Sequence, residues 1–246
     1  MDSVIIRKPN WIMFADSVGD RQEIHRDMSN VSPEIVEGYG LTKEFAPGMY
    51  IASFIQGWPC IQGVKSMKFR PKRVYDGDVI RVVALPNVVG KSIDYRFERG
   101  EETVCDVVGV RMGGPDGKEI KQMKEVYHEY NAEIRPSDVN YFLRSLGYCI
   151  EDGRPNMFLA SHSGPALLDY AEKEGVKGGF HATQGFNSHF PYGNGLISVL
   201  IGDGNSRKGK KGELQTYHMQ WVQNNRVIAS GRASVGVLEE ILKEGD

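Results

Sequence analysis

Residues 14–27 read FADSVGDRQEIHRD, and residues 45–54 read FAPGMYIASF. The first stretch places a carboxylate and an imidazole five residues apart, at Asp20 and His25, on a polar segment. The second stretch places a Pro-Gly pair directly before an apolar run, which is typical of the start of a buried helix. Together the two stretches predict a polar loop followed by a central helix that begins at Gly48.

The second half of the chain contains a similar arrangement. Residues 163–174 read SGPALLDYAEKE, and alignment of Gly48 with Gly164 gives an offset of 116 residues. The same offset carries Gly77, in VYDGD, onto Gly193, in FPYGN, and both glycines are interpreted as hairpin turns. An apolar, β-branched run follows each turn, VIRVVAL in the first half and LISVLI in the second. Matching order and spacing favour an internal repeat over two unrelated domains with similar turns.

The beginnings and ends of the two halves also match. The halves open with IRKPNWIMFADSVG from Ile6 and IRPSDVNYFLRSLG from Ile134, at an offset of 128 residues. Each half ends in a strand–turn–strand pattern, with turns predicted at Arg99–Gly100 and at Asn224–Asn225. One helix against a curled antiparallel sheet is an α+β arrangement. A lone copy would expose a sheet edge, so we expect the two copies to pair edge to edge.

Composition is that of an ordinary globular protein, with 40% hydrophobic and 25% charged residues. The net charge of −2 predicts no general attraction to nucleic acid or to anionic membranes. The segment MDSVIIRKPNWIMF does not fit a signal peptide, and no apolar run is long enough to span a bilayer. Three widely spaced cysteines, Cys60, Cys105 and Cys149, lack metal-site or disulfide spacing. We therefore expect a cytoplasmic protein with buried thiols.

The pattern F-A-x-x-x-G-D-x-x-x-I-H-x-D, followed by P-G-M-x-x-A-S, resembles the MaoC-like (R)-specific enoyl-CoA hydratases. The resemblance covers the first half well and the second half only as a repeat. It implies a tandem double hot-dog fold, in which residues 1–127 form the catalytic hot-dog and residues 128–246 the second. It also implies interconversion of trans-2-enoyl and (R)-3-hydroxyacyl thioesters. Coenzyme A or an acyl carrier protein would enter as part of the substrate, with no separate cofactor or metal. The chain would be a monomer of fused hot-dogs or a homodimer.

The same resemblance assigns roles to individual residues. Asp20 and His25 would hold the catalytic water, and the Gly48 backbone N–H would stabilise the thioester oxygen. Met49 and Ser53, on the central helix, would contact the substrate. The chemistry agrees, because hydration needs a base for water and an acid for the adjacent carbon. An N–H at a helix N-terminus stabilises the developing oxyanion. Because they belong to a loop, Asp20 and His25 are expected to be replaceable without loss of the fold.

This sequence departs from the family pattern within the loop. Gln22–Glu23 stand where the family has Asn-Pro, so the proline that fixes the conformation of the loop in the family is absent here. The spacer between His25 and Pro47 is also longer than in the family, which is expected to reshape the acyl pocket. Asp27 is expected to cap the helical segment that follows it or to orient His25.

The second half lacks the dyad. At an offset of 128 residues, Tyr148 stands opposite Asp20 and Gly153 opposite His25. Only one half of the chain would therefore be active.

A competing site involves Asp169, in GPALLDYA, which is similar to the helix motif of polyketide dehydratase domains. Such a site would combine Asp169 with His25 across the two halves. The preferred interpretation is an i,i+4 ion pair between Asp169 and Lys173. His189, in FNSHFPYGN, is interpreted as part of a hairpin turn. Two other functions stay open, an acyl thioesterase with Asp169 as its helix carboxylate and a non-catalytic acyl-binding hot-dog protein.

Overall fold

The computed structural model of the chain describes residues 3–38, 40–55, 61–70, 72–86, 92–148, 154–174, 179–209 and 212–237. Its strands are β1 (Ser3–Ile5), β2 (Ile61–Phe69), β3 (Val79–Pro86), β4 (Ser92–Arg99), β5 (Glu102–Met112), β6 (Val126–Ile134), β7 (Gly179–Ser188), β8 (Gly195–Gly209), β9 (Gly212–Gln223) and β10 (Arg226–Val237). Its α-helices are α1 (Lys8–Val18), α2 (Pro33–Gly38), α3 (Gly48–Ala52), α4 (Pro136–Ser145), α5 (Asn156–Ser161) and α6 (Ser163–Lys173). Two 3₁₀ turns, η1 (Glu23–His25) and η2 (Met28–Asn30), lie between α1 and α2.

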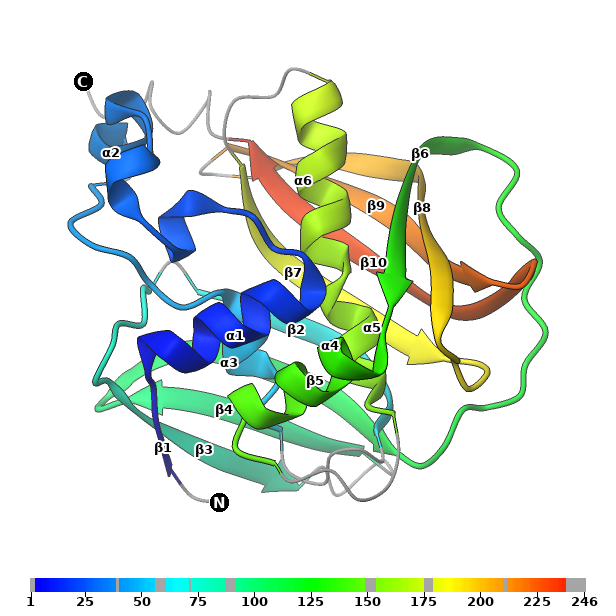
Figure 1. Cartoon of the computed structure of the whole chain (residues 1–246), viewed down its shortest axis with the longest axis horizontal. Coiled ribbons are helices and arrows are strands. Elements are labelled where there is room, and N and C mark those ends of the chain that lie inside the picture. The colour runs from blue at the N-terminus through cyan, green and yellow to red at the C-terminus, as the bar shows by residue number, and fades with distance from the viewer. Residues whose placement is uncertain are drawn as a thin grey trace.

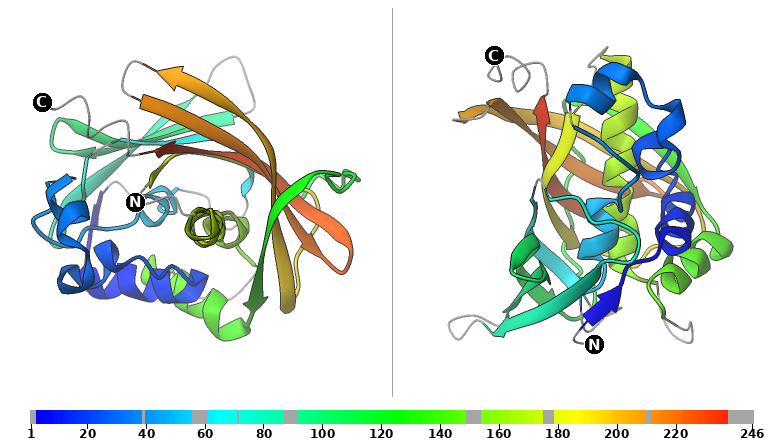
Figure 2. Two further views of the ribbon diagram at one scale, coloured as in Figure 1. Left: turned by 90° about the horizontal axis from the view of Figure 1, so that it is seen from above. Right: turned by 90° about the vertical axis from the view of Figure 1, so that its left-hand side faces the viewer.

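The described strands form one ten-stranded antiparallel sheet in the order β1-β3-β4-β5-β2-β7-β10-β9-β8-β6 (Figure 1). The second half runs β6-β8-β9-β10-β7 and therefore mirrors the first half, β1-β3-β4-β5-β2. The halves meet where β2 pairs with β7, with Gly63 opposite Asn187 and Val64 opposite Phe186. Each half thereby covers an edge of the other, which confirms the predicted edge-to-edge pairing and the α+β class. Figure 2 shows α6 end-on inside the curve of the sheet.

Helices α1 and α4 open the two halves and match each other in detail. Each follows an arginine, has proline in its first turn and ends at a glycine with positive φ. These glycines are Gly19 (φ 74°) and Gly147 (φ 77°), a backbone conformation that favours glycine at a helix C-terminus. The helices pack against each other, with the rings of Phe14 and Phe142 5.2 Å apart. The predicted equivalence of the two openings is confirmed.

The central helices correspond in a register that differs from the predicted one. Helix α3 follows a proline in PGMYIAS, and α5 follows a proline in PNMFLAS, at an offset of 108 residues. In each helix a serine hydroxyl, that of Ser53 or Ser161, donates to the carbonyl four residues earlier, at 2.7 and 2.8 Å. The alignment of Gly48 with Gly164 was therefore wrong. The helix SGPALLDYAEK lies in α6, which continues the second central helix beyond α5.

The predicted turns were correct for the long hairpins only. Asn224 and Asn225 join β9 to β10 with φ of 51° and 59°, as a two-residue hairpin turn requires. The β4–β5 turn lies at Gly100–Glu101, one residue later than predicted. Gly77 and Gly193 are not hairpin turns, because β2 does not pair with β3 and β7 does not pair with β8.

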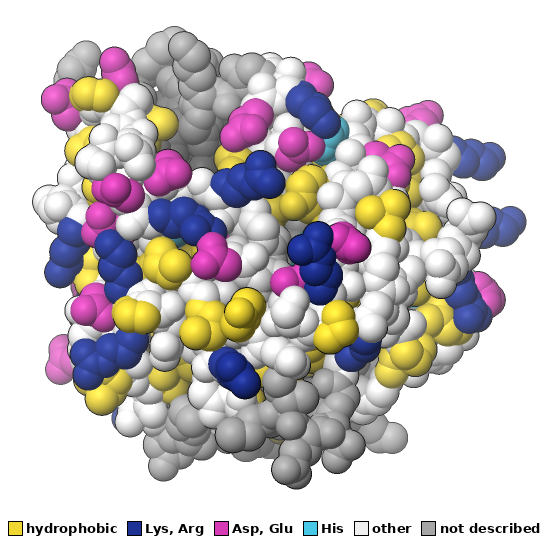
Figure 3. Space-filling view, in the orientation of Figure 1, with side chains coloured by type: hydrophobic (Ala, Val, Ile, Leu, Met, Phe, Trp, Pro, Cys, Tyr) yellow, Lys and Arg dark blue, Asp and Glu magenta, His cyan; other side chains and the backbone are white. Residues whose placement is uncertain are grey.

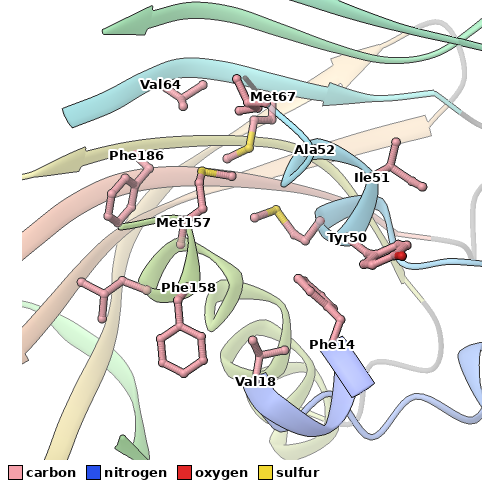
Figure 4. Packing of buried hydrophobic residues seen from close by; sticks show 14 of the residues in the cluster. Phe14, Val18, Tyr50, Ile51, Ala52, Val64, Met67, Met157, Phe158 and Phe186 are labelled. Atoms are coloured by element: carbon pink, nitrogen blue, oxygen red, sulfur yellow. The ribbon is translucent and has the colours of Figure 1, made fainter. Parts of the chain in front are cut away.

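One hydrophobic core runs through both halves. Tyr50 of α3 contacts Phe14, and Phe158 of α5 contacts Phe142, with ring centroids 5.4 Å apart in both pairs. Figure 4 shows Phe14, Tyr50 and Phe158 in this core beside β2 and β7. Cys105 is buried in the core, whereas Cys60 and Cys149 lie outside the described residues. Among the described helices, none has the length and apolar character needed to cross a bilayer.

Candidate active site

The loop that carries Asp20 begins where α1 ends. The Asp20 N–H donates to the Ala15 carbonyl at 2.8 Å, and Asp20 Oδ1 accepts from the Gln22 N–H at 3.0 Å. The Arg26 guanidinium donates twice to the Asp20 carbonyl, from Nε at 3.0 Å and Nη2 at 2.5 Å, and pairs with Asp16 at 2.7 Å. These contacts hold the loop where the family pattern has Asn-Pro.

His25 lies at the end of η1 with its ring held by the backbone. Its Nδ1 lies 2.8 Å from the Phe45 carbonyl oxygen, which can only accept, so Nδ1 carries the proton. Nε2 of the neutral ring is therefore an acceptor. The His25 carbonyl accepts from Trp11 Nε1 at 2.8 Å, and the Phe45 ring contacts the imidazole edge-on at 5.0 Å. The long spacer thus contributes directly, because Phe45 fixes the tautomer.

The two dyad residues are buried together. Asp20 and His25 are each only 6% exposed, so the loop that carries them is buried, whereas the expectation that they can be replaced without loss of the fold stays a prediction. Burial lowers the pKa of His25, while the Asp20 carboxylate and the Phe45 hydrogen bond raise it and Arg26 lowers it further. The net direction is downward from the ordinary value of 6.5. His25 is therefore neutral at pH 7, beside a carboxylate close enough to influence it.

The other predicted site residues are part of the core. Met49 and Ser53 of α3 are 6% and 0% exposed, and the Ser53 hydroxyl is bonded within the helix. A Cβ atom added to Gly48 would lie 2.7 Å from the Phe69 ring. Phe69 therefore fills the space beside Gly48. Any larger residue at position 48 would clash with the Phe69 ring. Like other first residues of a helix, Gly48 has no intrahelical acceptor for its N–H.

Tyr130 of β6, which the sequence interpretation missed, lies near the dyad loop. The Tyr130 hydroxyl is 3.2 Å from the position of a Cβ atom on Gly19, the residue before Asp20. Burial raises the pKa of Tyr130, and the charges of Asp169 and Asp20 raise it further, against a lowering effect of Arg21. His128, two residues earlier on the same face of β6, is 8% exposed. The second half therefore supplies the Tyr130 side chain beside the loop of the first.

Asp169 is bonded within the second half. Its Oδ2 lies 2.7 Å from His128 Nε2 and 3.1 Å from Lys173 Nζ, so the predicted pair with Lys173 is present. Burial alone would raise the pKa of Asp169, but these two hydrogen bonds and charges lower it overall. The histidine that Asp169 contacts is His128, whereas the competing interpretation required His25.

The remaining predicted positions are simpler. Asp27 caps η2 by accepting from the Ser29 N–H at 3.0 Å and hydroxyl at 2.7 Å, which confirms its predicted role. Tyr148 is half-buried against the core, and Gly153 lies outside the described residues.

Within the described ranges, no three or more His, Cys, Asp or Glu side chains gather in a way that could hold a metal ion. Figure 3 shows acidic and basic side chains interspersed over the face of α1, α4 and α6.

No known family profile matches the sequence, and no curated protein matches it. Solved structures do match. A MaoC-like dehydratase from Phytophthora capsici is 13% identical with a TM-score of 0.58, over 96% of this chain and 94% of that one. A conserved hypothetical protein from Mycobacterium tuberculosis, described as a double hot-dog, is 11% identical with a TM-score of 0.54, over 96% and 94%. The chain is a double hot-dog.

The double hot-dog fold is shared by proteins of different activity. A protein from Lactobacillus plantarum assigned as an oleoyl thioesterase is 7% identical with a TM-score of 0.51, over 97% of this chain and 95% of that one. At such identities the likeness shows the fold alone. Because one fold supports several reactions, the function must be argued from the site residues.

Proposed function

We propose that this double hot-dog chain interconverts trans-2-enoyl and (R)-3-hydroxyacyl thioesters at Asp20 and His25. One observation carries the proposal, a buried carboxylate and a neutral imidazole on one loop, with His25 Nδ1 bonded to the Phe45 carbonyl. That bond leaves Nε2 as an acceptor for a water O–H. A carboxylate and an imidazole that share one water divide the roles of base and acid between them.

The reaction balances with the residues of the loop. In the hydration direction, the water oxygen bonds to C3 of the enoyl group while the dyad takes one water proton. A proton is returned to C2, so that one water molecule is added in total. Negative charge develops on the thioester oxygen, and the Gly48 N–H at the start of α3 is the proposed donor to it. His25 serves in its neutral form, which the lowering of its pKa favours.

The proposal assigns the two halves different tasks. Residues 1–127 form the catalytic hot-dog, and residues 128–246 complete the sheet and place Tyr130 beside the loop. Met49 and Ser53, on the central helix, form part of the wall of the proposed acyl site. The acyl group arrives on coenzyme A or on an acyl carrier protein, and the chemistry calls for no further cofactor. The chain works as a monomer or as a homodimer, in the cytoplasm.

Loss of enoyl absorbance with crotonyl-CoA and longer trans-2-enoyl-CoA substrates tests this function. Asp20→Asn keeps the size of the side chain and the acceptor for the Gln22 N–H but removes the charge. We expect its turnover to fall by about a thousandfold. Glu23→Gln, an exposed carboxylate of the same loop, is the matched control and should keep the wild-type rate. Equal rates for Asp20→Asn and the control would rule out the proposed dyad.

A thioesterase is the second candidate, and it rests on the contact between Asp169 and His128 at 2.7 Å. In that case Asp169 would activate water against the thioester carbonyl, and free thiol would appear without change in the acyl chain. Release of coenzyme A, followed with a thiol reagent, measures this reaction. Thiol release that is lost in Asp169→Asn and kept in Asp20→Asn would favour the thioesterase over the hydratase.

A further inference from the structure

A row of four register partners crosses the outer face of the sheet. Ser230 on β10 lies opposite Asn187 on β7, Asn187 opposite Gly63 on β2, and Gly63 opposite Arg111 on β5. The residues that precede Ser230 and Asn187, Ala229 and Phe186, are buried, so the row faces away from the core. A Cβ atom on Gly63 would meet Asn187 Oδ1 at 2.8 Å and Arg111 Nη2 at 2.9 Å. Glycine therefore lets Arg111 reach across β2 and bond to Asn187.

His189 joins this row to the segment that follows β5. Its Nε2 lies 2.8 Å from Ser230 Oγ, and its Nδ1 lies 2.9 Å from Asp116 Oδ1. The imidazole is 3% exposed, and backbone bonds hold it from two sides, from its own N–H to Ile228 and from the Gly117 N–H to its carbonyl. The sequence interpretation of His189 as a hairpin residue was wrong.

The tautomer of His189 follows from its neighbours. A carboxylate oxygen at 2.9 Å from Nδ1 requires a proton on Nδ1, so Nε2 accepts from the Ser230 hydroxyl. Asn187 Nδ2 donates to Asp116 Oδ2 at 2.9 Å, and its approach to Nδ1 at 3.2 Å is then a secondary contact. Burial alone would raise the pKa of Asp116, but hydrogen bonds from Asn187, His189 and the Lys118 N–H lower it to about 2. Asp116 is thus a fixed negative charge that orients the imidazole.

We propose that Ser230, His189 and Asp116 form a second catalytic site that hydrolyses esters or thioesters by way of an acyl-serine. Hydroxyl, imidazole and carboxylate are arranged with the roles of a hydrolytic triad, which is recognised by geometry and not by fold. This site is separate from the dyad of the proposed hydratase and uses none of its residues.

Each step of the proposed reaction balances. Ser230 Oγ bonds to the substrate carbonyl carbon while its proton passes to His189 Nε2. The bond from that carbon to the leaving oxygen or sulfur then breaks, and the leaving group takes the proton from His189. Water attacks the acyl-serine in the same way, which releases a carboxylic acid and restores the hydroxyl. Arg111, whose guanidinium lies over Gly63 beside Asn187, is the donor assigned to the oxyanion.

The surroundings of Ser230 indicate an anionic substrate. Ser230 lines an open groove of about 830 Å³ on this face of the sheet. Among the described residues that line the groove, the charged side chains are four cations and one carboxylate, all exposed: Lys65, Arg111, Lys124, Arg232 and Glu125. Arg232 lies two residues beyond Ser230 on the same face of β10, which places it about 7 Å along the strand. An acyl chain that ends in a carboxylate or phosphate fits this spacing.

Two measurements on the full chain test the site. The first is covalent labelling by a fluorophosphonate, read as the intact mass. The second is hydrolysis of mono-4-nitrophenyl glutarate against 4-nitrophenyl acetate. The wild type should take one label and prefer the glutarate ester. Ser230→Ala should lose both activities, and Asp116→Asn should lose about a hundredfold or more in rate. Arg232→Gln should lose the preference for the glutarate ester.

The matched control is Ser234→Ala, because Ser234 lies on the same strand and its hydroxyl contacts Thr216 at 2.7 Å. Both Ser234→Ala and Asp20→Asn should label and hydrolyse as the wild type does. A folded wild type that takes no label, or that turns over neither ester, would overturn the proposal and leave the three residues as a clamp on the segment after β5. Equal rates for Ser230→Ala and the wild type would also overturn it.

Discussion

The two halves of the molecule differ most between their opening and central helices. From Gly19 to Pro47 the first half takes 28 residues, whereas from Gly147 to Pro155 the second takes only 8. The extra length contains η1, η2 and α2, and it carries both Asp20 and His25. The frame around it is shared, with the same helix caps, the same strand order and paired aromatic contacts. The proposed dyad thus lies on a segment that the shorter connection of the second half lacks.

The two halves also differ at the first residue of the central helix. Where the first half has Gly48, the second has Asn156, whose Nδ2 donates to the Ile61 carbonyl at 2.7 Å and whose Oδ1 accepts from Ser188 at 3.3 Å. Asn156 therefore links its helix to β2 and β7. This position is structural in the second half, and in the first half it is the proposed donor to the thioester oxygen.

Among substitutions outside the dyad itself, the largest effect is expected from loosening the loop that is present only in the first half. Arg26→Gln removes both bonds to the Asp20 carbonyl and the pair with Asp16. Displacement of a catalytic group by about 1 Å can cost about a hundredfold in rate, so we expect kcat to fall by that amount on crotonyl-CoA. Arg21→Gln, an exposed arginine of the same loop, is the control. Wild-type kcat in Arg26→Gln would show that the loop is held without this arginine.

Acid should lower the free energy of unfolding through His162, a buried histidine of the second half that has no titratable counterpart in the first. At the position of Phe54 the second half has His162, whose pKa burial lowers to about 4. The unfolded histidine has a pKa of about 6.5, so the unfolded state binds the proton first as pH falls. The contribution of neutral His162 to the free energy of unfolding is therefore complete above about pH 6.5, and about 2 kcal/mol of it is lost by about pH 4.5.

Urea unfolding of the wild type and of His162→Phe between pH 7.5 and 4.5 measures this contribution. The variant carries the residue of the first half and should lose less stability with acid. Parallel pH dependences of the two free energies of unfolding would contradict the assignment to His162.

The smallest effect is expected from Asn156→Ala, which removes the two bonds from the second central helix. Loss of a buried hydrogen bond costs about 1–3 kcal/mol, and we expect the free energy of unfolding to fall by about 1.5 kcal/mol. Turnover of crotonyl-CoA should be unchanged, because this half lacks the dyad. A loss of turnover as large as that of Arg26→Gln would show that the halves are not functionally separate.

Local sequence patterns predicted the elements that depend on local physics. The match between the openings of the two halves and the Asn224–Asn225 turn follow from backbone preferences that neighbouring residues determine. The alignment of the central helices failed because two Gly/Pro pairs were matched by type. The longer match between PGMYIAS and PNMFLAS gives the correct register.

The site residues that were missed depend on contacts that are distant in sequence. His128 meets Asp169 across 41 residues, and His189 meets Asp116 across 73 residues. Tertiary packing decides such contacts, and for His128 it depends on the register of β6, since a shift of one residue would turn that side chain to the opposite face. The dyad could be proposed from sequence because both its members lie on one loop, whereas the contact of His25 with the Phe45 carbonyl could not be foreseen.

The pH dependence of crotonyl-CoA hydration by the wild type and by His25→Asn tests the central claim most directly. The asparagine amide can still donate to the Phe45 carbonyl but cannot exchange a proton with water, and a folded variant is checked by its thermal transition. Because the pKa of His25 is lowered, the wild-type kcat/KM should be flat above about pH 6.5 and should fall only at lower pH. His25→Asn should be slower by about a thousandfold at neutral pH. A folded variant with the wild-type rate, or a wild type whose rate does not fall in acid, would contradict catalysis by the Asp20–His25 dyad.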